Sequence, residues 1–310
     1  WEEVTKDFKA IYVAVGAHHS LAMGLQGEDL EGVVGAVEFL REVNLGQKPA
    51  VGQKVAVIGG GNSAVDAARS ALRLGAEEVT IVYRRLRDDM PAQEAEIKAA
   101  EEEGVNIQYL VAPNRYRGDN GQVKGVVCQR MSLGQFDSSG RRRPLPIAGA
   151  EFELEADMVI SAISQRPELT FWKTESSDQD QVTKDGLIKT NDQTHCRVGQ
   201  ALVFAGGDAV SGPGTVIRAI AEGHRAAAEI DAAIRAENGE PAYEAPPQEE
   251  IDLPGIIDEE IKETPRAAMP QAPASERIMD FREVELGFSQ DVALAEARRC
   301  LRCDVQEETV

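Results

Sequence analysis

The stretch VAVIGGGNSAVDAARSALRLGAEEVTIVYRR, residues 55–85, decides the fold of this chain. Its first four residues form an apolar run rich in β-branched side chains, which is typical of a buried parallel strand, and the run leads directly into three glycines. Apolar residues then recur at spacings of three and four, which predicts a helix that Gly75 ends. A second apolar run at 79–82 completes a βαβ unit. The apolar face of the expected helix comprises Ala64, Val65, Ala68, Ala71 and Leu72.

The glycines of this unit match the pattern G-x-G-x-x-G/A through Gly59, Gly61 and Ala64. Gly59 permits a sharp turn, Gly61 lets the backbone approach a pyrophosphate, and the small Ala64 lets the helix pack close to the strand. Backbone amides at the start of the helix would then donate to the phosphates. The motif therefore predicts a dinucleotide site, and a tight turn without a ligand is the alternative.

The residues after the second strand discriminate between the two nicotinamide dinucleotides. An NAD site usually has an acidic residue there for the ribose 2′-hydroxyl, whereas an NADP site offers arginine to the 2′-phosphate. This chain has Arg84 and Arg85, and Glu77 and Glu78 come too early, before the strand. Arginine binds phosphate through a planar pair of donors. The sequence favours NADP, the alternative being that both arginines are exposed charges at a strand end.

Composition limits the classes of function. A chain of 310 residues with 42% hydrophobic residues is long enough for two domains. Its net charge of −20 argues against nucleic acid and anionic membranes as partners, and no apolar run has the length of a membrane span. Four cysteines, two of them in one CxxC, make no disulfide framework, so we expect a reducing, cytoplasmic setting. The chain starts at Trp1, and we expect this start to be a cut one.

The rest of the first half extends the dinucleotide-binding pattern. We expect a helix at 93–103 and a third strand at 105–111, which with the βαβ unit at 55–82 give the β-α-β-α-β order of a mononucleotide-binding half. A strand at 8–15 and a helix at 36–43 are expected before that unit. His18 and His19 follow the first strand, and two histidines in a loop are more often solvated than catalytic.

An antiparallel strand is expected at 123–131, a polar excursion at 134–149, and a buried strand at 157–163. Three arginines of the excursion, Arg141, Arg142 and Arg143, are interpreted as a solvated surface patch.

The second half begins with a strand at 201–207 that leads into Asp208, followed by a helix from Thr215 to about Arg235. The glycine-flanked start of that helix is a potential anion site, and the alternative is a packing helix whose Asp208 only satisfies turn amides. Residues 236–263 hold ten acidic residues against one lysine, which predicts an extended arm. A short helix at 291–301 carries Cys300, and Cys303 follows. The apolar face of the long helix comprises Val216, Ala219, Ile220, Ala227 and Ile230.

Taken in order, the motifs VAVIGGGNSAVDAAR, VTIVYRR, DMPA, GRRRPLPI, ADMVISAIS, FAGGD and GPGTVIRAIAEGHRAA resemble the small subunit of glutamate synthase and its relatives, over residues 8–235. The resemblance implies an α/β fold in which a Rossmann-like NADP-binding domain is inserted into an FAD-binding domain. It also implies hydride transfer from NADPH to FAD, and electron transfer through iron–sulfur clusters to a partner subunit or domain.

The same resemblance implies roles for particular residues. Arg84 and Arg85 would bind the 2′-phosphate, and Gly16 and Ala17 would lie along the FAD. Gly207 and Asp208 resemble the second FAD motif, and the amides of Thr215 and Val216 would lie at the flavin ring. The residues implied at the NADPH pyrophosphate are Gly59, Gly60, Gly61, Asn62, Ser63 and Ala64.

The chain also departs from the family pattern. The first FAD glycine motif and the cysteine-rich cluster region are missing, so we expect an excised piece, or a protein whose other half is a separate polypeptide. Cys300 and Cys303 supply two of about four cluster ligands, the alternative being two free thiols. The expected domains are 1–45 and 165–235 for the partial FAD-binding domain, 46–164 for the NADP-binding domain, and 236–310 for a Pro- and acid-rich arm. The expected function is NADPH-dependent flavin oxidoreduction, and the alternative is a nucleotide-binding regulatory or scaffolding subunit.

Overall fold

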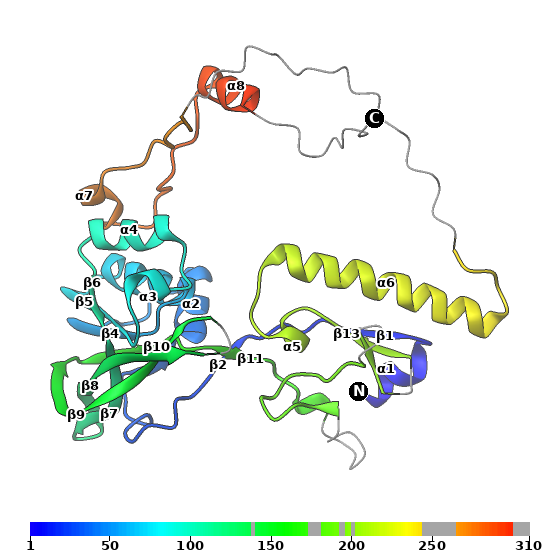
Figure 1. Ribbon diagram of the computed structural model, residues 1–310, viewed down its shortest axis with the longest axis horizontal. Coiled ribbons are helices and arrows are strands. Elements are labelled where there is room, and N and C mark those ends of the chain that lie inside the picture. The colour runs from blue at the N-terminus through cyan, green and yellow to red at the C-terminus, as the bar shows by residue number, and fades with distance from the viewer. Residues whose placement is uncertain (138–139, 173–180, 192–195, 200–201, 244–264, 300–310) are drawn as a thin grey trace. The chain divides into compact units, whose positions relative to one another are not determined.

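The computed structural model describes residues 1–137, 140–172, 181–191, 196–199, 202–243 and 265–299 (Figure 1). The chain divides into two units, Trp1–Glu244 and Ala245–Val310.

A parallel five-stranded sheet forms the centre of the first unit. The sequence stretch at 55–85 supplies its two middle strands and the helix between them, as its apolar pattern predicts. Val57 of one strand lies opposite Ile81 of the next, and both are fully buried because each face of the sheet is covered. In sheet order the strands are β3 (Val33–Gly35), β10 (Met158–Ser161), β4 (Lys54–Ile58), β5 (Glu78–Tyr83) and β6 (Asn106–Tyr109).

Three helices cover one face of this sheet: α2 (Ala36–Asn44), α3 (Asn62–Arg73) and α4 (Glu94–Glu102) (Figure 1). The small buried residues of α3 let the helix pack closely on the sheet, as the alanine-rich face predicts. Val55 and Val57 of β4 point to this helical side, and Ala56 and Ile58 point to the opposite side. This alternation places a separate core on each face of the sheet.

The other face packs on an antiparallel sheet of β7 (Val111–Asp119), β8 (Gln122–Phe136) and β9 (Arg142–Glu155). The expectation of a polar excursion at 134–149 is therefore wrong for most of its length, because β9 begins at Arg142 and pairs with β8. Most of the first half of β9 is exposed, so it carries no apolar alternation that would reveal a strand.

The remaining part of the first unit has its own small sheet, in which β1 (Ile11–Val13) runs parallel to β13 (Val203–Ala205) and β12 (Arg197–Val198) is antiparallel. The chain passes between this sheet and the five-stranded sheet through two segments that pair as β2 (His19–Ser20) and β11 (Gln165–Arg166). The helices beside the small sheet are α1 (Glu2–Asp7), α5 (Asp208–Ser211) and α6 (Val216–Asn238).

Helix α6 differs from its predicted packing. Val216 and Ile220, expected on a packed apolar face, are 76% and 51% exposed, and Ala226 is the buried residue of the helix. The helix also continues past Arg235 to Asn238, where Gly239 ends it in the left-handed conformation.

The second unit is described over residues 265–299 and contains α7 (Ala274–Arg277) and α8 (Gln290–Arg298). Helix α8 confirms the short helix expected at 291–301 as far as Arg298, but Cys300, which that helix is expected to carry, and Cys303 lie outside the described residues. Within the described ranges, no helix has both the length and the apolar character needed to cross a bilayer.

Candidate functional site

The turn between β4 and α3 is built on glycines that the surrounding protein requires. Gly59 has a φ of 146°, and a Cβ there would lie 2.4 Å from the carbonyl oxygen of Ala162. A Cβ at Gly60 would lie 2.5 Å from the ring of Tyr83. These two positions therefore exclude side chains because of packing within the protein itself.

Gly61 differs, because it has room. The atom nearest to a Cβ at Gly61 would be Cγ of Pro91, at 3.9 Å, and the backbone at Gly61 is extended. The bare backbone of Gly61 instead keeps the adjoining cavity open at the start of α3. The amides of Asn62 and Ser63 have no acceptor within the helix, whereas the Ala64 amide donates to the carbonyl oxygen of Gly61 at 3.0 Å. The first turn of α3 is uncharged. This surface fits an approaching pyrophosphate.

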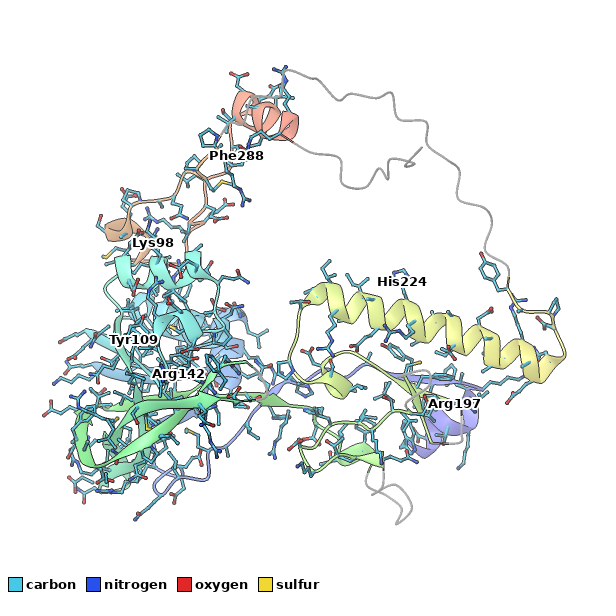
Figure 2. The ribbon with its side chains drawn as sticks, viewed as in Figure 1. Lys98, Tyr109, Arg142, Arg197, His224 and Phe288 are labelled. Atoms are coloured by element: carbon cyan, nitrogen blue, oxygen red, sulfur yellow. The ribbon has the colours of Figure 1, made fainter. Side chains whose placement is uncertain are left out.

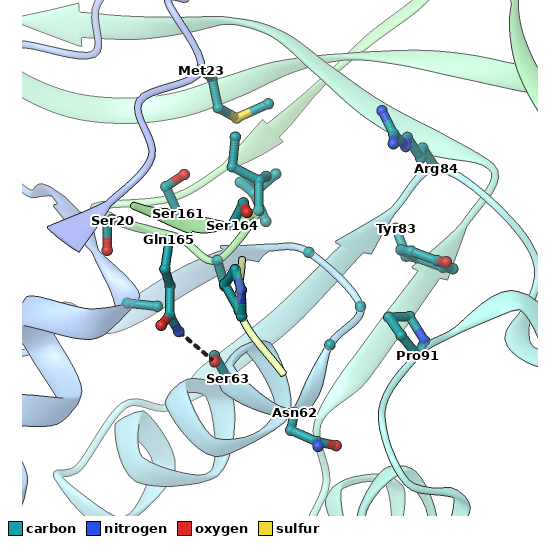
Figure 3. Close-up of a pocket in the computed structure, with 18 of the residues that line it drawn as sticks. Ser20, Met23, Asn62, Ser63, Tyr83, Arg84, Pro91, Ser161, Ser164 and Gln165 are labelled. Carbon is teal, nitrogen blue, oxygen red and sulfur yellow. Dashed lines mark hydrogen bonds between the residues drawn. The ribbon is translucent and has the colours of Figure 1, made fainter. Parts of the chain in front are cut away.

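The side chains of the first turn of α3 have protein partners. The Asn62 Oδ1 accepts from the amide of Gln93 at 2.9 Å, and the Ser63 Oγ accepts from the Gln165 amide nitrogen at 3.4 Å (Figure 3). These contacts tie the turn to the start of α4 and to β11.

A cavity of about 970 Å³ opens over this turn. Figure 3 shows Tyr83, Arg84 and Pro91 on one side of the glycine turn, and Ser161 and Gln165 on the other. The cavity thus follows the carboxyl ends of β4, β5 and β10, which is where open α/β sheets bind ligands.

The two arginines that follow β5 have different environments. Arg84 is exposed and lines the cavity. Arg85 is only 4% exposed, and its guanidinium donates to Oδ2 of Asp137 at 2.7 Å and to the carbonyl oxygen of Arg142 at 2.9 Å. Arg85 also lines the cavity, although these protein contacts hold its guanidinium. The expectation that both arginines bind a 2′-phosphate stays a prediction.

Arg141 also lines the cavity, although the sequence pattern suggested a surface patch. Its side chain is half-buried, whereas the side chains of Arg142 and Arg143 are exposed. The triplet gave no signal that would separate one arginine from the next. The different environments of the three arginines follow from the register of β8 and β9, and sequence periodicity does not predict that register.

The residues expected at a flavin lie around the small sheet. Gly16 has a φ of 68°, and Ala17 is buried. Gly207 has a φ of 67° and donates its amide to Glu222, and the Asp208 Oδ1 accepts from the amide of Gly214 at 3.0 Å. The contact between Asp208 and the Gly214 amide agrees with the alternative from the sequence, in which Asp208 only satisfies amides of the turn.

The start of α6 is capped by the Thr215 side chain, which accepts from the amide of Arg218 at 3.4 Å. Val216 follows it with its side chain exposed. A flavin role for Thr215 and Val216 therefore stays a prediction.

His19 lies 3.8 Å from Glu38 and 3.6 Å from Glu168, with all three side chains partly exposed. Within the described residues, no group of three or more His, Cys, Asp or Glu residues is arranged to hold a metal ion. The predicted cluster ligands Cys300 and Cys303 lie outside that part of the chain.

The parallel sheet, the glycine turn at the start of α3 and the cavity above it define a dinucleotide-binding α/β protein. A family model for pyridine nucleotide-disulphide oxidoreductases matches residues 2–223. The chain belongs to the pyridine nucleotide-disulphide oxidoreductase family. This membership confirms the α/β fold and the class expected from the sequence, an oxidoreductase that uses a nicotinamide dinucleotide.

Curated relatives show which members of this family the chain is similar to. The β subunit of the NADP(+)-dependent formate dehydrogenase of Moorella thermoacetica is 43% identical over 310 residues, covering 97% of this chain and 43% of that protein. The small chain of glutamate synthase [NADPH] of Escherichia coli (strain K12) is 35% identical over 238 residues, covering 73% of this chain and 50% of that protein. They confirm the resemblance to the glutamate synthase small subunit, and the chain spans about half the length of these relatives or less.

Among solved structures, Mycobacterium tuberculosis FprA in complex with NADPH has a TM-score of 0.62 at 21% identity, covering 79% of this chain and 68% of that one. This similarity supports the fold.

Proposed function

We propose that this chain binds NADPH at the turn between β4 and α3 and serves an NADPH-dependent flavin oxidoreductase of the glutamate synthase small-subunit type. One observation carries the proposal: Gly61 leaves a cavity open at the start of α3, and Arg84 lines that cavity. Backbone amides there would donate to the pyrophosphate. The exposed guanidinium of Arg84 would meet the 2′-phosphate.

In this proposal residues 46–164 form the NADP-binding domain, to which β3 and α2 also contribute because they belong to the same sheet and its core. The rest of residues 1–45 and residues 165–235 belong to an FAD-binding domain. A bound flavin supplies an acceptor for the hydride at its N5 atom. The protein would hold the nicotinamide end of the dinucleotide against the side of the cavity that Ser161 and Gln165 line. Gly16, Ala17, Gly207, Asp208, Thr215 and Val216 are the proposed flavin contacts.

The proposed electron acceptor is a partner subunit or domain, through iron–sulfur clusters to which Cys300 and Cys303 would contribute. Relatives that are named as subunits, a formate dehydrogenase β subunit and a glutamate synthase small chain, support a partner of this kind. The buried thiol of Cys128, which forms no disulfide, is compatible with the proposed cytoplasmic setting.

The test is the binding of NADP⁺ and NAD⁺ to the full 310-residue chain, measured by isothermal titration calorimetry, with Arg84→Asp as the variant. The native chain should bind NADP⁺ more tightly than NAD⁺. The variant should lose at least about tenfold in NADP⁺ affinity, because a carboxylate would repel the 2′-phosphate, and its NAD⁺ affinity should hold or rise. A native chain that binds neither dinucleotide would overturn the proposal.

The second candidate is a nucleotide-binding regulatory or scaffolding subunit without redox turnover. It is favoured by the contact between Asp208 and the Gly214 amide, which accounts for this aspartate without a flavin. A visible spectrum separates the two candidates after the chain is mixed with FAD. Flavin that co-purifies with the chain and bleaches on NADPH addition supports the oxidoreductase. NADPH binding without flavin binding supports either the scaffold or an excised piece of the oxidoreductase.

A further inference from the structure

The side chain of Arg85 anchors a hairpin to the end of β5. It is buried, and its Nη2 donates to Oδ2 of Asp137, where β8 has just ended, at 2.7 Å. Its Nε donates to the carbonyl oxygen of Arg142, the first residue of β9, at 2.9 Å. One guanidinium therefore holds both sides of the β8–β9 hairpin at its closed end, next to the cavity.

Asp137 connects Arg85 to Arg141 through hydrogen bonds. The amide of Asp137 donates to the carbonyl oxygen of Arg141 at 2.8 Å, and the amide of Arg141 donates to Oδ1 of Asp137 at 3.3 Å. The Asp137 carboxylate thus joins the Arg85 guanidinium to the backbone of Arg141. Because Arg85 is buried and Asp137 is fixed from both sides, the backbone position of Arg141 is set by the end of β5.

The three arginines of the triplet have different surroundings as a result. Arg141 is half-buried and lines the cavity together with Tyr83 and Arg84. Arg142, labelled in Figure 2, is bound across the hairpin to the carbonyl oxygens of Leu133 and Gly134, at 3.0 and 3.1 Å. Arg143 is exposed and is not among the residues that line the cavity.

The charge of Arg141 acts at the same place as that of Arg85. Burial raises the pKa of the Tyr83 hydroxyl, and the positive charges of Arg85 and Arg141 oppose that rise. Tyr83 is the last residue of β5, so both positive charges act at the strand end, where a dinucleotide in this site would carry its 2′-phosphate.

We propose that Arg141 is the second ligand of the 2′-phosphate, paired with Arg84, and that Arg85 and Asp137 are positioning residues that hold Arg141 at the cavity. The proposal rests on NADPH being the ligand of this site. It replaces the expectation that Arg84 and Arg85 form the pair. Arg84 at the end of β5 and Arg141 in the β8–β9 hairpin would then contact the phosphate from two different elements. Selection for the phosphorylated dinucleotide would therefore depend on the position of the hairpin relative to β5.

The main experiment compares Arg141→Ala, just before β9, with Arg143→Ala, a matched removal of one arginine from the same triplet. Calorimetry measures the affinities of the full chain for NADP⁺, NAD⁺ and 2′,5′-ADP. Arg141→Ala should weaken NADP⁺ and 2′,5′-ADP by about tenfold or more, since a charge-assisted contact is lost, and leave NAD⁺ within about twofold. Arg143→Ala should leave all three affinities within about twofold of the native chain.

Arg141→Lys and Asp137→Asn complete the series. The lysine variant should recover part of the loss, because it restores the charge but not the planar pair of donors. Asp137→Asn should lower the ratio of NADP⁺ to NAD⁺ affinity by less than Arg141→Ala does, a change that a merely structural role would not produce.

The outcomes separate this proposal from the one on which it rests. If the native chain prefers NADP⁺ and Arg141→Ala keeps the native ratio, the role of Arg141 is overturned while the NADPH site stands. If Arg143→Ala lowers the ratio as much as Arg141→Ala, the effect is general charge and the specific role is also overturned. If the native chain binds none of the three ligands, the proposed function itself fails.

Discussion

At the scale of single residues, Gly59 and Gly61 serve different requirements although both belong to one motif. Gly59 adopts a φ of 146° and lies against the Ala162 carbonyl, so alanine there meets both strain and a clash. Gly61 is extended and has open space, so alanine there fits the protein. The motif thus combines one glycine for the fold with one for the ligand.

Two alanine variants test this division. Gly59→Ala should lower the free energy of unfolding by about 2 kcal/mol or more, measured by urea denaturation. Gly61→Ala should change it by less than about 0.5 kcal/mol and weaken NADP⁺ binding by about tenfold, because the methyl group occupies the approach of the pyrophosphate. Native NADP⁺ affinity in a folded Gly61→Ala protein would contradict the assignment of this turn.

The glycines could be identified from sequence because their requirement is local, a turn between a strand and a helix. The place of Arg141 could not, because it depends on a contact between Asp137 and Arg85, which are 52 residues apart. The sequence of three consecutive arginines therefore does not show that Arg141, rather than Arg142 or Arg143, lies at the cavity.

At the scale of elements, α3 and α4 are joined by a buried ionic cluster. Glu103, the residue that ends α4, has a fully buried side chain that accepts from Arg69 at 2.8 and 3.0 Å and from Arg73 at 2.9 and 3.0 Å. Burial alone would raise the pKa of the Glu103 carboxyl, but the hydrogen bonds and charges of the two arginines lower it below its ordinary value of 4.5.

A lowered pKa in the folded state means that this carboxylate stabilises the protein fully above the unfolded value of about 4.5, and that the contribution is lost as the pH falls through the folded value. Glu103→Gln should therefore lower the free energy of unfolding by about 3 kcal/mol near pH 7. It should also reduce the fall of that free energy with decreasing pH on the acid side. Glu102→Gln is the control, because the exposed Glu102 side chain has its Oε1 3.8 Å from Nζ of Lys98. This substitution should lower the free energy of unfolding by less than about 0.5 kcal/mol. Equal losses for both variants would show that the cluster contributes no specific stability.

Elements with strong apolar patterns were predictable, and those without were not. The core strand β4, helix α3 and strand β5 follow directly from the sequence at 55–85. The first half of β9 was missed because most of its side chains are exposed, so its pairing with β8 leaves no alternation to detect. For α6 the apolar pattern predicts the helix but not its packing, since Val216 and Ile220 of the expected face are 76% and 51% exposed.

At the scale of the whole first unit, the buried apolar residues form separate clusters. Two of them cover the two faces of the five-stranded sheet, and two others surround the small sheet of β1 and β13. The chain passes between the two sheets through the segments that carry β2 and β11. We therefore expect the part that holds the glycine turn to respond to NADP⁺ as a unit of its own.

Hydrogen exchange followed by mass spectrometry tests this expectation on the full chain without added flavin. NADP⁺ at about 100 times its dissociation constant stabilises the binding-competent fold by about 2.7 kcal/mol, which slows exchange only where opening requires that fold to be lost. Amides of β4, β5 and β10 should therefore gain protection, and those of β13 and of the carboxyl-terminal half of α6 should exchange as before. Equal protection across both groups would mean that the unit opens as one cooperative body, and residues 46–164 would then not be a separate NADP-binding domain.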